Sequence, residues 1–256
     1  MKNCLILGSG RSGTSMVAAT LAKAGYFMGD RLSTERFSNP MGNFEDIEIN
    51  RLNEILLAQV VPKRPRFIGN YFFRHRPIMW QRWLSSVPLN IDLPASELVT
   101  KQITALTARE PYCFKDPRFS YTLPVWRPFL KDTVFVCVFR EPATTAESIL
   151  KLSQKAPYLQ NFSINWERAI QVWTLMYKHI LEIHRYQGEW LFLHYNQAVT
   201  PPGLTRLAAF TEAAVDYSVP DPSLCQSFSN ATVSEQAQKI YHQLCQLAAY
   251  QEPVFA

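Results

Sequence analysis

A glycine-rich segment near the N-terminus has the composition of an anion-binding loop. It reads Gly8-Ser-Gly-Arg-Ser-Gly-Thr-Ser15, and it lies between a short apolar run and a stretch with helical periodicity. Glycine permits positive φ and close backbone approach, and the free N–H groups at a helix start attract phosphate. The loop also carries hydroxyl and guanidinium donors. We therefore predict a phosphate site formed by Gly10, Arg11, Ser12, Gly13, Thr14 and Ser15.

Two common nucleotide-binding patterns fit this loop only in part. As a triphosphatase loop, G-x-x-x-x-G-K-[ST], it has Thr14 in place of the lysine that contacts β- and γ-phosphates. A P-loop kinase or triphosphatase is therefore an alternative that Thr14 disfavours. As a dinucleotide loop, G-x-G-x-x-G, it has Asp30 about 20 residues further on. The second strand that such a fold needs, Tyr26–Gly29, is interrupted by glycine.

Cationic residues also follow two later apolar runs. Thr133–Phe139 is rich in β-branched and aromatic residues, and Arg140 follows it directly, with Ser148 eight residues further on. Lys115-Asp-Pro-Arg118 closes another run. The carboxyl ends of parallel strands share one edge of a sheet, where ligands bind. We therefore expect Gly8, Lys115 and Arg140 to meet, although each cation could also belong to an ordinary ion pair.

Taken in order, these motifs resemble those of sulfotransferases that use 3′-phosphoadenosine 5′-phosphosulfate (PAPS). In that family the residue in the Arg11 position contacts the sulfuryl group, and the Lys-Asp-Pro lysine, here Lys115, stabilises the leaving phosphate. The positions of Arg140 and Ser148 hold the 3′-phosphate, and a strand-end tyrosine, here Tyr195, contacts adenine. The donor has no β- or γ-phosphate, which suits a loop without lysine. The resemblance implies PAPS as donor, 3′-phosphoadenosine 5′-phosphate (PAP) as product, and no metal.

Sulfuryl transfer to a hydroxyl requires a base that takes the proton. Asn39-Pro-Met-Gly-Asn-Phe-Glu-Asp46 resembles an Asn-Pro-x-Gly-aromatic-aromatic-Glu segment of bacterial family members, with Asn43 in an aromatic position. Glu45 is the candidate base, and the alternatives are Glu35, Asp46 and Asp116. Acidic residues here would also favour the dipole of the helix that follows. We expect His194 to be a packed or hydrogen-bonded histidine, and a non-catalytic nucleotide-binding protein remains a further alternative.

Short apolar runs alternate with helical patterns along the chain, which predicts an α/β fold. Its core would be a central, mostly parallel sheet flanked by helices, and the resemblance implies a three-layer, P-loop-like arrangement. We expect one domain over residues 1–256, with a helical C-terminal segment from about residue 201. The expected strands are Cys4–Leu7, Tyr112–Phe114, Thr133–Phe139 and Trp190–Leu193. The expected helices lie near Thr14–Ala24, Asp46–Val60, Ser96–Thr107, Ala143–Ser153, Trp166–Tyr186, Thr205–Thr211 and Ser234–Ala249.

Residues 62–94 fit neither the helical nor the strand periodicity and are expected to form an inserted excursion. The segment Pro62–Arg82 carries six cations and no acid, so it contributes +6 to a net charge of +5 and leaves −1 for the rest. That balance argues against a nucleic-acid surface. The excursion is also rich in aromatic residues, which could stack on sugars or touch a membrane. We expect a carbohydrate or lipid-linked glycan acceptor, with core-packed aromatics as the alternative.

The cysteines and the chain's hydropathy bear on its compartment. The five cysteines are scattered, odd in number and without metal-ligand spacing, so we expect buried, reduced thiols. No apolar run approaches the roughly 18 residues of a membrane helix. The first apolar run, Cys4–Leu7, is too short for a signal peptide. These features predict a protein of the cytoplasm.

Overall fold

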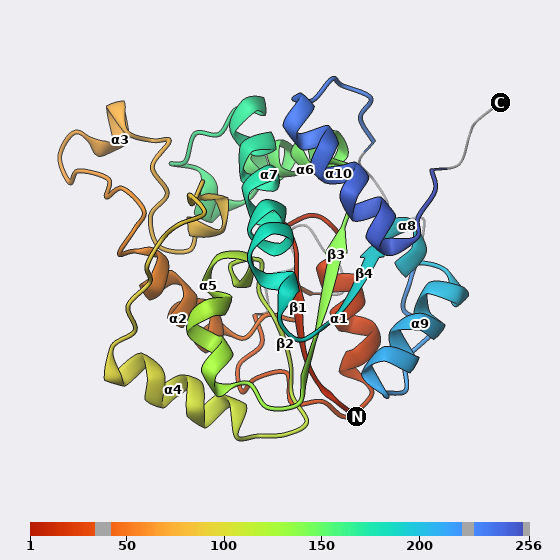
Figure 1. Cartoon of the computed structure of the whole chain (residues 1–256). Helices are drawn as coiled ribbons and strands as arrows, with labels where there is room; N and C mark the ends of the chain where they lie inside the picture. The colour runs from red at the N-terminus through yellow and green to blue at the C-terminus, as the bar shows by residue number, and fades with distance from the viewer. Residues whose placement is uncertain (34–41, 222–227, 253–256) are drawn as a thin grey trace.

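The computed structural model describes residues 1–33, 42–221 and 228–252 (Figure 1). Four strands form one parallel sheet in the order β2-β1-β3-β4. Their bounds are β1 Asn3–Leu7, β2 Cys113–Lys115, β3 Thr133–Phe139 and β4 Glu189–His194. Each lies within a residue or two of a predicted strand, and the predicted α/β class is confirmed.

Helices cover both faces of the sheet, so the strands are buried on both sides. Because successive strand side chains point to opposite faces, Leu5 and Leu7 contribute to one core and Cys4 and Ile6 to the other. The first core is completed by α2 (Ile47–Leu57), α4 (Glu97–Thr107), α5 (Phe119–Trp126), α6 (Pro142–Lys155), α7 (Trp166–Glu182) and α10 (Glu235–Ala248). The second is completed by α1 (Thr14–Ala22), α8 (Tyr195–Ala198) and α9 (Pro201–Thr211).

The strand order places a ligand crevice at a defined point. β1 lies between β2 and β3. The chain therefore runs from β1 to β2 on one side of it and then crosses to β3 on its other side. Crevices for ligands form at the carboxyl ends of strands where the order reverses in this way. The order also contradicts the dinucleotide alternative, which needs the segment after α1 to pair with β1. That segment pairs instead through Phe27 with Tyr112, at the start of β2.

The sequence missed helix α5 because it contains Pro124. Proline lowers helix propensity, but Phe119, Leu123 and Trp126 are all fully buried in the core, and that burial outweighs it. The long predicted helix over residues 166–186 ends at Glu182, and a 3-10 turn, His184–Tyr186, follows it. Cys4, Cys113 and Cys137 are buried free thiols in the strands, as predicted, whereas Cys245 in α10 is free but only half-buried. Cys225 lies outside the described residues.

Residues 62–94 lie outside the sheet and its covering helices. At the outer end is the one-turn helix α3 (Gly69–Phe72), which Figure 1 shows at the periphery of the molecule. The 3-10 turn η1 (Arg82–Leu84) leads back inward, and Trp83 and Leu84 are buried in the core. In the described part of the chain, no helix is long and apolar enough to cross a bilayer.

Asp46 begins α2 and bonds to three backbone amides. Its Oδ1 accepts from the N–H groups of Glu48 (2.8 Å) and Ile49 (3.1 Å), and its Oδ2 accepts from Arg31 (2.7 Å). We expect Asp46→Ala to lower the free energy of unfolding by about 1–2 kcal/mol, since a helix cap is lost. Urea denaturation measures this, with Asp46→Asn as the control that keeps a capping oxygen. Equal stability of Asp46→Ala and wild type would contradict the capping role.

Candidate active site

The glycine loop joins β1 to α1 in a conformation that needs its glycines. Gly8 has φ +137°, and a Cβ there would lie 2.2 Å from the carbonyl oxygen of Val138 in β3. The Tyr177 hydroxyl, from α7, donates to that same carbonyl (2.7 Å) and accepts from the N–H of Ser9 (3.1 Å). The loop is therefore held against β3 by one buried phenol.

The loop and the end of β3 meet in one region, as the sequence predicts. The Arg140 guanidinium lies over the ring of Tyr195, 4.8 Å from its centroid. That ring packs against Gly13, where a Cβ would lie 2.4 Å from Cδ2 of Tyr195. Arg11 Nε donates to Ser148 Oγ at 3.0 Å. The two predicted phosphate sites are therefore neighbours.

The guanidinium groups of Arg11 and Arg140 repel each other, although Glu141 Oε2 lies 3.7 Å from Arg140 Nε and balances part of the charge. Burial lowers the pKa of the Arg11 guanidinium, and the nearby charge of Arg140 lowers it further. The hydroxyl of Ser148 and the positive end of α1 add no negative charge. Two cations held together in this way form a site that a phosphate or sulfate group would stabilise.

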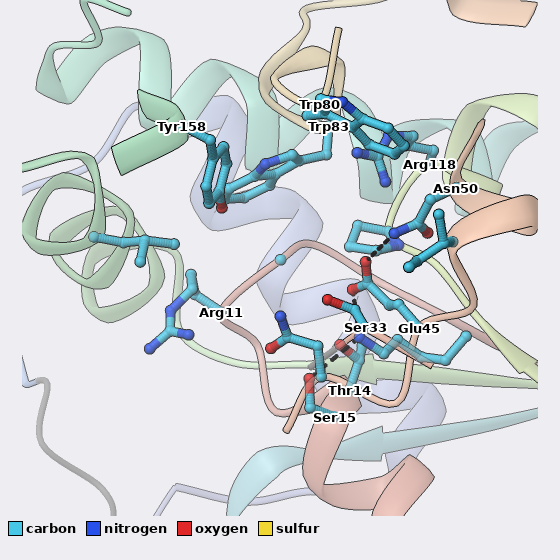
Figure 2. A pocket seen from close by; sticks show the side chains of 16 residues that line it. Arg11, Thr14, Ser15, Ser33, Glu45, Asn50, Trp80, Trp83, Arg118 and Tyr158 are labelled. Atoms are coloured by element: carbon cyan, nitrogen blue, oxygen red, sulfur yellow. Dashed lines mark hydrogen bonds and ion pairs between the residues drawn. The ribbon is translucent and has the colours of Figure 1, made fainter. Parts of the chain in front are cut away.

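A cavity of about 360 Å³ opens beside the loop. Figure 2 shows Tyr158, Trp80 and Trp83 along one side and Thr14, Ser15 and Glu45 along the other. Six predicted site residues line the cavity, namely Gly10, Arg11, Thr14, Ser15, Glu45 and Lys115. The other five, Ser12, Gly13, Arg140, Ser148 and Tyr195, belong to the loop itself and to the region around Arg140. The cavity thus has a polar, charged side and an aromatic side.

Glu45 and Lys115 form an ion pair in the polar part of the cavity. Lys115 Nζ lies 2.5 Å from Glu45 Oε1 and donates to Ser15 Oγ at 3.2 Å. Asn50 Nδ2 donates to the second carboxylate oxygen of Glu45 at 2.9 Å. Burial alone would raise the pKa of Glu45, but Lys115 and Arg118 outweigh it, so the pKa lies below its ordinary value. Glu45 is therefore a carboxylate near neutral pH.

The alternative bases have other partners. Asp46 caps α2, while Asp116 is fully buried and accepts from Arg118 (2.8 and 2.9 Å) and from Asn53 (2.8 Å). Burial raises the pKa of the Asp116 carboxyl, and Arg118 counters this only in part. Glu35 lies outside the described residues, as do residues 39–41 of the motif that contains Glu45. Among the described candidates, Glu45 is the carboxylate that faces the cavity.

Arg118 is the centre of a buried ion network that sequence reasoning treated only as a possible ion pair. It donates to Asp116 and, through Nε, to Glu54 Oε1 at 2.9 Å. Arg82 of the excursion donates to the other oxygen of Glu54 at 2.7 Å. Burial alone would lower the pKa of Arg118, but the two carboxylates raise it. The network therefore joins the Lys-Asp-Pro motif, α2 and the excursion.

His194 is fully buried and hydrogen-bonded, as the sequence predicts. Its Nδ1 accepts from the N–H of Asn196 at 3.1 Å, and its Nε2 lies 3.2 Å from a carboxylate oxygen of Glu141. Tyr250 stacks on the imidazole with 3.8 Å between ring centroids. The segment after α10 therefore packs beside the residue that follows Arg140.

Two solved structures share this architecture along nearly their whole length. The sulfotransferase domain from the Synechococcus PCC 7002 olefin synthase superposes with a TM-score of 0.55 at 19% identity, covering 99% of this chain and 98% of that one. The sulfotransferase domain from the curacin biosynthetic pathway gives 0.56 at 16% identity, covering 98% and 99%. This chain has the sulfotransferase fold. No protein-family model and no curated protein sequence matches it.

The shared fold confirms the resemblance that the motifs indicated, at the level of architecture. The structure of this chain also places residues at the site that the sequence did not reveal. Tyr158 follows α6 and lines the cavity, and Asn50 orients Glu45 from α2. Neither lies in a motif, since each is brought to the cavity only by packing. Tyr177 sits on the buried face of α7, where a tyrosine looks like any core aromatic residue.

Tyr177→Phe tests how the loop is held. The substitution keeps the ring but leaves the buried Val138 carbonyl and Ser9 N–H without their partner, so we expect a loss of about 1–3 kcal/mol in unfolding free energy. Urea denaturation measures the loss, and Tyr186→Phe, at an exposed tyrosine, is the matched control. An unchanged midpoint for Tyr177→Phe would show that the phenol does not anchor the loop.

Proposed function

We propose that this protein transfers a sulfuryl group from PAPS to a hydroxyl of an acceptor. The observation that carries the proposal is the adjacency of the glycine loop to Arg140 and Ser148, through Arg11 and Tyr195. A single adenosine with charge at both its 3′ and 5′ positions needs two such cationic sites. The loop would hold the 5′ group, and Arg140 and Ser148 the 3′-phosphate.

Glu45 and Lys115 would perform the chemistry from the polar side of the cavity. The acceptor oxygen forms a bond to sulfur while the bond between sulfur and the phosphate oxygen breaks, and the hydroxyl proton passes to the Glu45 carboxylate. Lys115 Nζ contacts both Ser15 Oγ and Glu45, so one ammonium reaches the loop and the base. Lys115 and Arg11 would stabilise the negative charge that develops on the leaving phosphate.

The aromatic side of the cavity supports a carbohydrate acceptor. Trp80, Trp83 and Tyr158 line the side of the cavity opposite Glu45 (Figure 2). Aromatic faces pack on the apolar faces of sugar rings, while hydroxyls point toward polar groups. A sugar, free or linked to a lipid, therefore fits the cavity better than a fully apolar alcohol. The excursion's Arg64 and Arg82 are engaged with backbone carbonyls and Glu54, so they hold the wall rather than the acceptor.

The nucleotide assignment predicts discrimination between PAP and 5′-AMP. PAP should bind more tightly, because only PAP carries a 3′-phosphate for Arg140 and Ser148. We expect Arg140→Ala to weaken PAP at least about tenfold, the value of a charge-assisted hydrogen bond, and to leave 5′-AMP nearly unchanged. Calorimetric titration measures both, and Arg51→Ala, on the exposed face of α2, is the control.

Equal affinities of wild type for PAP and 5′-AMP would remove the role given to Arg140. Magnesium-dependent binding of ATP in the same titration would instead favour a P-loop kinase or triphosphatase. Thr14 stands in the loop where those enzymes have a lysine, which argues against magnesium-dependent binding of ATP.

The base assignment predicts a loss of turnover with retained binding. We expect Glu45→Gln to lower kcat at least about 100-fold, the lower end for a positioned proton acceptor, with PAP affinity kept. Glu48→Gln, three residues along the chain, is the control. Wild-type turnover in Glu45→Gln would exclude Glu45 as the base, and retained PAP binding without any transfer in wild type would favour a non-catalytic binding protein.

The ion pair predicts how the rate responds to pH. Glu45 acts only when deprotonated, and its pKa is held below the ordinary 4.5, so the acid limb of the rate profile lies below that pH. Lys115→Met removes a cation that lowers this pKa. The limb should therefore move to higher pH in the variant, in addition to any fall in rate. A profile that keeps its acid limb would contradict the coupling.

A further inference from the structure

Four large apolar side chains are exposed together at the outer end of the excursion. Phe67 is 92% exposed, Tyr71 82%, Phe72 74% and Ile68 50%. We call these residues the α3 tip, because they lie on and immediately before α3 (Figure 1). A soluble surface rarely gathers such side chains without a partner. The residues of the α3 tip neither line the cavity nor belong to the core clusters.

The α3 tip is held firmly although its side chains are exposed. Arg64 donates to the carbonyls of Arg76 (2.8 Å), Arg74 (3.1 Å) and Asn161 (2.8 Å). Gly69 packs on the same side chain, since a Cβ there would lie 2.5 Å from Arg64 Cγ. The backbone under the tip is therefore fixed by one arginine, and the apolar side chains project outward from a rigid base.

Uncompensated positive charge surrounds the tip. Within the described residues, no carboxylate forms an ion pair with Lys63, Arg64, Arg66, Arg74 or Arg76, whereas Arg82, nearer the core, pairs with Glu54. Hydrogen bonds to carbonyls leave the arginine charges in place. The α3 tip thus combines projecting apolar side chains with neighbouring cations, in a chain whose residues outside Pro62–Arg82 sum to −1.

We propose that the α3 tip docks this protein on an anionic lipid bilayer. Aromatic and aliphatic side chains enter the boundary between headgroups and acyl chains, and flanking Lys and Arg are attracted by anionic lipids. A protein partner fits less well, because specific interfaces usually bury about 800 Å² on each partner. The four side chains lie on or immediately before one short peripheral turn, so they do not extend over a broad face (Figure 1).

The same excursion carries two of the three aromatic residues on the aromatic side of the cavity. Trp80 and Trp83 follow the α3 tip along the chain and line the same cavity as Glu45. A docked molecule would therefore hold the cavity near the headgroups, where the hydroxyl of a lipid-linked sugar lies. This consequence for the acceptor rests on the proposed function, whereas docking itself does not.

Vesicle co-sedimentation without nucleotide tests the docking. The vesicles are phosphatidylcholine alone and phosphatidylcholine mixed with phosphatidylglycerol. We expect wild type to bind the mixed vesicles more tightly, and Phe67→Ser/Phe72→Ser to lower the partition coefficient at least about tenfold. Lys63→Gln/Arg66→Gln should remove the preference for anionic lipid. Leu98→Ser, at a residue 67% exposed on α4, is the matched control, and an unchanged melting temperature shows that each variant folds.

Two results would overturn the proposal. One is equal binding of wild type to both kinds of vesicle, or to neither. The other is a double variant, Phe67→Ser/Phe72→Ser, that binds the mixed vesicles as wild type does. If vesicles are not bound and light scattering shows a self-association that the double variant abolishes, the tip is a contact between copies of the chain. Failure of PAP binding would leave the vesicle result intact, so the two proposals fail separately.

Discussion

The parallel pairing of β1 with both β2 and β3 is the constraint on which the site depends. The register sets Ile6 opposite Lys115, and Leu7 opposite Cys137. The chain therefore leaves all three strands at one edge, with the glycine loop in the middle. A slip of one residue would turn every strand side chain to the opposite face. The two buried cores fix the register and, through it, the positions of Lys115 and Arg140.

Glu45 and Asp46 are adjacent in the sequence, but their carboxylates have different hydrogen-bond partners. Asp46 uses its oxygens on three backbone amides, whereas Glu45 directs its carboxylate at Lys115 and Asn50. The buried ions around Arg118 add little net stability, because removing charges from water offsets their attraction. Their effect is to fix geometry, since they tie the segment after β2 to α2 and to the excursion.

The sequence predicted the strands, the layers and the residues that meet at the sheet edge, because buried strands and glycine loops leave local signals. It did not predict α5, where burial of Phe119 and Trp126 overrides Pro124. Nor did it reveal Tyr158 or Tyr177, whose roles arise from contacts with residues far along the chain. The motif resemblance predicted Glu45 rather than Asp46 as the base, but only the fold shows that Glu45 lines the cavity while Asp46 caps α2.

Two of the three aromatic residues that line the cavity, Trp80 and Trp83, come from the excursion, which lies outside the sheet. Trp83 touches the loop at Gly10, where a Cβ would lie 2.5 Å from the indole, but Trp80 has no such neighbour in the glycine loop. Divergence of the excursion around Trp80 could therefore reshape the aromatic side of the cavity while the side formed by the glycine loop stays unchanged. A new specificity would then arise by replacing a peripheral module rather than by rebuilding the fold.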